Sequence, residues 1–228
     1  MDATLLILSD RCSMYLEKFI EARSVLRKQG LDPLLWQGKP LSEKDLDAVD
    51  QRTDYSMPAE LRRFHLEMGD GFEFIPNDDP ETPLDGWTRN CLHDYATWNK
   101  GFHMAIEEEA EDEIASSRPR ADPRLLREEA ERRKKWIPFY GFNGAGNVLC
   151  LDAEGKVRFY EAASWVALPQ SWDLVLADSF TDFVEKWSRY CFVAPGSGSS
   201  WDSFLVNHSS SFDWSPSHFP RGFDRTKF

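Results

Sequence analysis

The segment from Trp136 to Asp152 constrains the fold more than any other part of the chain. Its sequence, WIPFYGFNGAGNVLCLD, places two apolar runs on either side of a stretch rich in Asn and Gly. Because Asn and Gly tolerate the positive φ angles of a tight reversal, the segment predicts a β-hairpin. A second reversal at 154–156 leads into Val-Arg-Phe-Tyr at 157–160, which predicts a third strand. Such an antiparallel meander is stable only when other elements cover it.

Six helices are predicted around this meander. Their signals are apolar side chains at spacings of three and four, together with polar N-caps such as Ser42 and Ser179. Residues 72–75 are typical of a further strand, and the Pro-rich residues 76–90 of a loop. The predicted fold class is therefore α+β, a single domain in which helices flank an antiparallel meander, with helices at roughly 12–28, 42–49, 58–68, 92–116, 123–135 and 180–191.

The end of the chain differs in composition from the rest. A Pro-Gly-Ser-Gly-Ser-Ser run begins at Pro195 and is typical of a linker. The last 28 residues are rich in Ser, Phe and Trp, and so many aromatic side chains argue against a purely disordered tail. We expect a domain over 1–194 and an extension over 195–228 that either folds back on the domain or docks on a partner.

Charge and cysteine content exclude several classes of protein. The formal net charge of −12 opposes general binding to nucleic acid, whose phosphates would be repelled. The four cysteines are scattered and form no CxxC pair, so they are expected to be reduced, mostly buried thiols in a reducing compartment. The sequence has neither a signal peptide nor a run of about 18 apolar residues. These features predict a cytoplasmic protein that does not bind membranes.

Known catalytic and cofactor patterns are missing. The glycines at 143–146 could suggest a phosphate-binding loop, but a strand follows them, so no helix N-terminus is available to hold an anion. His93-Asp94 is the one adjacent pair of histidine and acid, and it lacks a nucleophile pattern. Asp152 is expected to stabilise a turn by accepting backbone N–H bonds. We therefore predict no catalytic residue, no metal and no cofactor, and hence a protein that is not an enzyme.

One helix is strongly acidic and the next is basic. Within 107–113, six of seven residues are acids, namely Glu107, Glu108, Glu109, Glu111, Asp112 and Glu113. Between 118 and 135, eight basic residues stand against four acidic ones. The two helices could form a charge-matched antiparallel pair, or they could present two solvated faces with modest attraction, about 0.5 kcal/mol per exposed pair.

Three motifs in this order resemble the SUKH superfamily, which includes the Syd protein, fungal cell-wall synthesis regulators and bacterial immunity proteins. The first is a helix that begins near Pro58 and runs into the glycine-containing turn at 69–71. The second is the Trp-Ile-Pro-Phe strand at 136–139 with its glycine turn and Asp-ended partner strand, and the third is the Ser-Phe-Thr-Asp-Phe segment at 179–183. The resemblance spans roughly 50–190; the first 50 residues and the 195–228 extension match nothing in it.

The resemblance implies a binding fold without a catalytic motif. For a bacterial member it implies an immunity protein that neutralises a toxin by tight contact, and the acidity of the chain suits a basic toxin domain. The alternative is a regulatory or scaffold protein of the same fold that binds a cellular enzyme. We expect the partner-binding residues to be the six acids of 107–113 together with aromatic anchors in the extension, Trp201 and Trp214.

Overall fold

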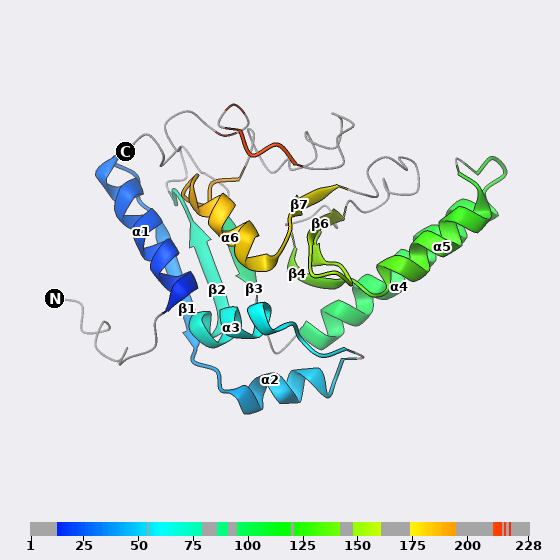
Figure 1. Cartoon of the computed structure of the whole chain (residues 1–228), viewed down its shortest axis with the longest axis horizontal. Coiled ribbons are helices and arrows are strands. Elements are labelled where there is room, and N and C mark those ends of the chain that lie inside the picture. Colours follow the sequence, from blue (N-terminus) through cyan, green and yellow to red (C-terminus); the bar gives the residue numbers. More distant parts are fainter. Residues whose placement is uncertain are drawn as a thin grey trace.

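The computed structural model describes residues 13–53, 55–78, 86–90, 95–119, 121–141, 148–160, 174–194, 212–215, 217 and 219. These residues form a single α+β domain, which confirms the predicted fold class (Figure 1). The described helices are α1 (Met14–Lys28), α2 (Glu43–Asp50), α3 (Ala59–Met68), α4 (Tyr95–Ala115), α5 (Pro123–Arg133) and α6 (Phe180–Ser188). The described strands are β1 (Leu34–Lys39), β2 (Asp70–Ile75), β3 (Trp87–Asn90), β4 (Ile137–Gly141), β5 (Val148–Leu151), β6 (Val157–Tyr160) and β7 (Val175–Ala177).

The predicted meander is present as β4, β5 and β6. Strands β4 and β5 pair antiparallel from Ile137 opposite Leu151 to Gly141 opposite Val148, and β5 pairs with β6 in the same sense. The hairpin loop at 142–147 lies outside the described residues. Strand β7 extends this sheet as an unpredicted fourth strand, because three residues are too few to show a period.

A second antiparallel sheet, in the order β1-β2-β3, was only partly predicted. Its middle strand contains the expected residues 72–75, but β1 lies in the part of the chain without a recognised motif. The prediction that 76–90 is entirely loop is wrong, because Trp87 begins a strand that pairs with β2. Pairing and burial decide this, since Trp87 is only 2% exposed despite the prolines before it. The hydroxyl of Tyr140 on β4 donates to the Gly86 carbonyl at 2.7 Å and links the two sheets.

The main core lies between the two sheets and helices α1, α3 and α6. Aromatic rings fill much of it: Trp87 stacks on Trp187 of α6 at 5.5 Å between centroids and on Phe64 of α3 at 5.1 Å. Phe19 of α1 stacks on Phe192 at 3.8 Å. Burying such rings contributes more than any polar contact at the surface. The high tryptophan content therefore serves the core in this region.

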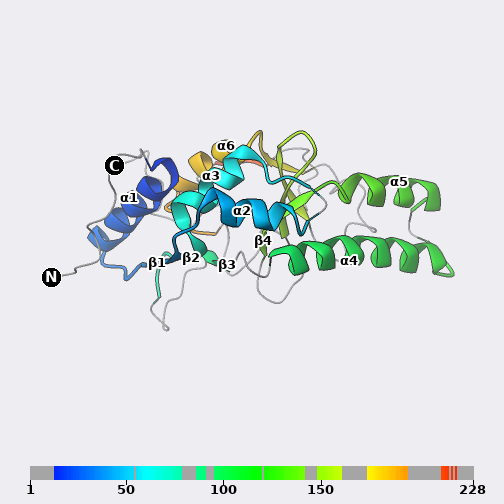
Figure 2. The same ribbon diagram turned by 90° about the horizontal axis from the view of Figure 1, so that it is seen from below.

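A second, smaller core lies on the opposite face of the meander. Alternate residues of a strand point to opposite faces, so Leu149 joins the main core while Val148 and Cys150 face away from it. Helices α4 and α5 cover this second face with Ile106 and Leu126, both fully buried. Figure 2 shows the two helices side by side, extending away from the sheets. Both faces of the meander are thus covered, and α4 with α5 form an arm.

Some helices are capped at their N-terminus by a residue nearby in the sequence, and others by a residue from another helix. The capping box is present at α2, where Ser42 and Asp45 bond to each other's backbone N–H groups. Pro58 is the N-cap of α3 rather than part of its first turn. At α1 the cap comes from another helix, because the Glu67 carboxylate of α3 accepts the N–H of Tyr15 at 2.6 Å. This contact ties the start of α1 to the main core.

Candidate partner-binding surface

The acidic and basic helices form the antiparallel pair that their charges suggested. Ion pairs join Glu107 to Lys134 and, at 3.3 Å, Glu111 to Arg127. These glutamates remain 53% and 64% exposed, so each pair stabilises the arm by only about 0.5 kcal/mol. Burial of apolar side chains between α4, α5 and the meander holds the arm, and the ion pairs set its register.

A buried charged group lies at the base of the arm. The Arg133 side chain is 1% exposed and its Nε donates to the Glu129 carboxylate at 2.6 Å. Its guanidinium also lies over the rings of Trp136, at 4.6 Å, and Tyr160, at 5.6 Å. Burial lowers the pKa of Arg133, and the neighbouring Glu129 carboxylate opposes that effect. These contacts fix α5 to the end of the meander, so Trp136 and Arg133 have a structural role.

The six acids predicted to bind a partner divide into three pairs. Glu109 and Glu113 point inward: Glu109 accepts the Tyr160 hydroxyl at 2.6 Å, and Glu113 is only 7% exposed. Glu107 and Glu111 face α5 through their ion pairs. Glu108 and Asp112 are exposed, and neither makes an ion pair with another described residue. Glu107 and Glu111 are also more than half exposed, but Lys134 and Arg127 offset their charge, so the uncompensated negative charge of this run lies on Glu108 and Asp112.

Glu108 and Asp112 belong to a continuous exposed row along α4. Together with Gly101 and Met104 they recur at spacings of three and four, which places them on one side of the helix. We call this row the outer face of α4. Met104 is 47% exposed, and a Cβ added at Gly101 would meet open space. Gly101 and Met104 were not among the predicted site residues, although the spacings of three and four residues that link them to Glu108 and Asp112 are visible in the sequence.

Of the two predicted aromatic anchors, only Trp214 lies among the described residues. Trp201 lies outside the described residues. Trp214 is half-buried against the main core, and its indole N–H donates to the carbonyl of Leu176 at 2.6 Å. Its ring also contacts Phe183 of α6 at 5.9 Å. Trp214 is thus engaged by its own domain in this structure, in agreement with an extension that folds back.

The histidines of the described helices, His65 and His103, make contacts within the fold. His65 of α3 is 8% exposed, and burial lowers its pKa to about 4 while the nearby Asp70 carboxylate opposes the shift. Its Nε2 has no hydrogen-bond partner among the described residues. The Nε2 of His103 lies 2.9 Å from the Trp136 carbonyl oxygen. His93 and Asp94 lie outside the described residues.

Asp152 has the turn role that the sequence predicted. One carboxylate oxygen accepts the N–H groups of Glu154 and Lys156, both at 2.9 Å, and the other accepts the Nε of Arg158 at 2.8 Å. Cys150 and Cys191 are buried free thiols, as expected. Burial raises the pKa of the Cys150 thiol well above its ordinary value. A neutral, enclosed thiol is a poor nucleophile.

The described part of the chain was also considered as a metal-binding protein and as a membrane-spanning one. No three His, Cys, Asp or Glu side chains among those residues gather closely enough to hold a metal ion. None of the described helices has both the length and the apolar content needed to cross a membrane.

Comparison with protein families places these observations in context. The sequence model of the SMI1 / KNR4 family (SUKH-1) matches residues 40–186, which is more than half of the chain. The matched range takes in helices α2 to α5, including the arm, and all of the four-stranded sheet, and it ends within α6. Comparison with curated protein sequences gives no match to the chain.

Proposed function

The chain belongs to the SMI1/KNR4 family (SUKH-1), and we propose that it is a non-enzymatic domain that neutralises a bacterial toxin by direct binding. The proposed partner is a basic toxin domain, such as a nuclease, met in the cytoplasm. The net charge of −12 supports this choice of partner, because opposite fields accelerate encounter and disfavour like-charged competitors. The proposed mode of action is to cover a functional surface of the toxin, with no chemical step.

The observation that carries the proposal is the outer face of α4. Glu108 and Asp112 are exposed there, while Glu107 and Glu111 pair with α5 and Glu109 accepts the Tyr160 hydroxyl. The arm keeps this row in a fixed geometry, because Ile106 and Leu126 beneath it are fully buried. A fixed row of carboxylates loses little conformational entropy when it meets a basic surface.

Met104 adds an apolar contact at the near end of the same row. Its side chain is 47% exposed, and an unbranched thioether adapts to surfaces of irregular shape. An interface gains most of its energy from a few large buried side chains and uses charge to select the partner. In this proposal Met104 contributes contact area, and the two carboxylates contribute attraction and orientation.

The experiment pairs the chain with the toxin encoded beside its gene. Co-expression should restore growth of cells that produce the toxin, and purified toxin should bind the chain with an affinity that falls as salt is raised. Glu108→Lys should slow association by about five- to tenfold at low salt. The matched control is Glu17→Lys on α1, an exposed glutamate away from the arm, which makes the same change in net charge.

Three results would count against the proposal. If the chain neither binds the neighbouring toxin nor restores growth of cells that produce it, the proposed immunity role is wrong. Equal effects of Glu108→Lys and Glu17→Lys would show that net charge matters but the outer face of α4 does not. Binding to a cellular enzyme without any rescue would favour the regulatory or scaffold alternative instead.

A further inference from the structure

The described part of the C-terminal extension lies along β7, the outermost strand of the four-stranded sheet. The N–H of Phe212 donates to the carbonyl of Val175 at 2.8 Å, and the indole N–H of Trp214 donates to the carbonyl of Leu176 at 2.6 Å. In Figure 1 the red segment, residues 212–215, passes above β7 and α6. The extension thus satisfies peptide groups on a sheet edge that would otherwise face solvent.

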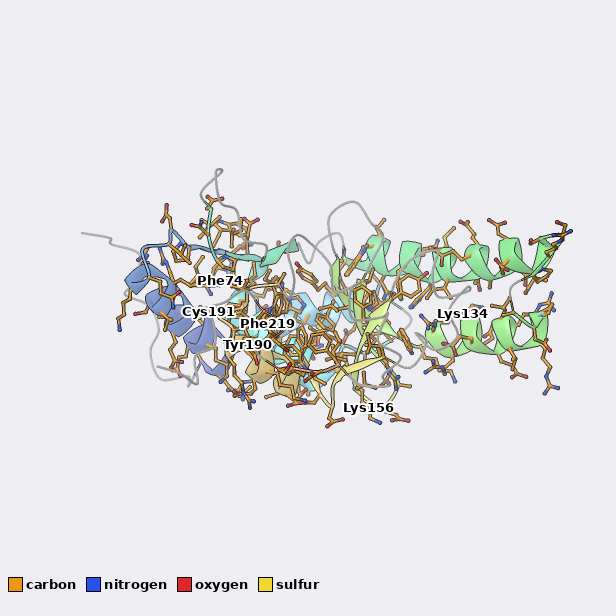
Figure 3. All side chains as sticks on the ribbon, turned by 90° about the horizontal axis from the view of Figure 1, so that it is seen from above. Phe74, Lys134, Lys156, Tyr190, Cys191 and Phe219 are labelled. Atoms are coloured by element: carbon orange, nitrogen blue, oxygen red, sulfur yellow. The ribbon has the colours of Figure 1, made fainter. Side chains whose placement is uncertain are left out.

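The side chains of this segment dock in the same place. Phe212 and Trp214 are two residues apart and contact each other at 4.8 Å between ring centroids, and Phe212 is 7% exposed. The Tyr190 hydroxyl at the end of α6 donates to the carbonyl of Trp214. Phe219 stacks on the Tyr190 ring at 3.6 Å with the planes 3° apart, and Figure 3 shows these two side chains close together.

This combination is the one by which sheets bind peptides from other proteins. Main-chain bonds to an edge strand supply affinity, and recesses for alternate side chains supply specificity. Here the receiving groups belong to β7, α6 and the turn after α6, namely Val175, Leu176, Phe183 and Tyr190, which we call the tail site. The segment that fills it is joined to the domain through 195–211, which contains the predicted Gly/Ser linker.

We propose that the tail site is a binding site for an extended peptide with the pattern aromatic-x-aromatic. The chain's own Phe212-Asp213-Trp214 fills it in cis, and a segment of the same pattern from a protein partner replaces it. A tether of this length and composition gives an effective concentration of about millimolar, so a peptide in trans must compete with the tail. The inference does not depend on toxin binding, since the tail site lies on β7, α6 and the turn after α6, and not on the arm.

The main test separates the tail from the domain after folding. A protease site placed at 196–200 in the full chain is cleaved in the folded protein, and a fluorescent peptide with the sequence 210–221 is titrated by polarisation. The cleaved protein, after the released tail is removed, should bind the peptide at least about tenfold more tightly than the intact chain. The same peptide with Phe212→Ala and Trp214→Ala should not bind.

A second measurement uses the uncleaved chain. Trp214→Ala in the chain removes the tail's indole bond to Leu176 and its ring contact with Phe183 but leaves the tail site itself unchanged, so the tail should dock less firmly and the wild-type peptide should bind at least a few-fold more tightly. Ser217→Ala is the matched control, because Ser217 is exposed and bonds only to the hydroxyl of Ser215 among the described residues. It should leave peptide binding unchanged.

The alternatives give different results. A tail that never leaves the cleaved protein, or whose release unfolds the domain, would make the segment a permanent part of the core and overturn the proposal. Equal peptide binding by the wild-type chain, Trp214→Ala and Ser217→Ala would do the same. The intact chain could instead form concentration-dependent dimers that the peptide dissociates. That result would show that a second copy of the chain occupies the tail site, and it would overturn the assignment to a different protein.

Discussion

The buried histidine of α3 predicts a specific loss of stability in mild acid. His65 is 8% exposed, its Nε2 has no hydrogen-bond partner in the part of the chain that the structure describes, and burial lowers its pKa to about 4 from an ordinary value of 6.5. Its ring packs against Phe64 and Tyr95, and Asp70 is the nearby charge that partly opposes the shift. The folded protein therefore excludes a proton that the unfolded chain accepts.

The sign and size of the effect follow from the two pKa values. Above pH 6.5 the imidazole is neutral in both states, and the contribution of His65 is fully present. As pH falls from 6.5 to about 4, the unfolded chain gains a proton that the folded protein does not, so stability falls. One pKa unit corresponds to about 1.4 kcal/mol, so the loss attributable to His65 reaches about 3 kcal/mol near pH 4.

The assay is urea unfolding of the wild-type chain and His65→Leu from pH 7.5 to 4. Leu is neutral and similar in size, so at pH 7 the two proteins should agree within about 1 kcal/mol. At pH 4 His65→Leu should be the more stable by about 3 kcal/mol, because the acid-induced loss from carboxylates is common to both proteins and cancels. Parallel loss of stability in the two proteins between pH 7 and 4 would refute the reasoning.

A control separates this site from histidine content in general. His103 is half-buried on α4, and its Nε2 lies 2.9 Å from the carbonyl oxygen of Trp136. Glutamine carries an amide N–H that can keep that bond, so His103→Gln should retain the wild-type loss between pH 6.5 and 4. If His103→Gln removed the loss, the pH dependence would belong to α4 rather than to His65.

Three further changes test contacts within the fold, each by urea unfolding at pH 7. Glu67→Gln should destabilise the protein by about 1 kcal/mol, because the carboxylate that caps the Tyr15 N–H becomes neutral. Gly38→Ala should cost about 3 kcal/mol or more, since its Cβ would lie 1.7 Å from the Asp70 carbonyl oxygen. Gly101→Ala should instead stabilise by up to about 1 kcal/mol, because its Cβ meets open space in a helix. A stabilised Gly38→Ala or a destabilised Gly101→Ala would contradict these assignments.

The candidate surface was only partly visible in the sequence. The acidic run of 107–113 and the basic helix after it were apparent, and their antiparallel pairing was one of two alternatives that the charges left open. Which acids remain available was not, because Glu109 and Glu113 turn inward only when α4 packs on Tyr160 and α5. Similarly, Trp214 was predicted as a partner-binding anchor, and its position against Leu176 depends on a strand nearly forty residues earlier in the chain.

The sequence by itself determined the features whose causes are local. The capping box at Ser42 and the turn at Asp152 each depend on contacts between residues a few positions apart. Tertiary structure alone decided β1, β3 and β7, the capping of α1 by Glu67 and the docking of the extension on β7. These features arise from groups far apart in the chain, whose pairing becomes favourable only after the aromatic core has brought them together.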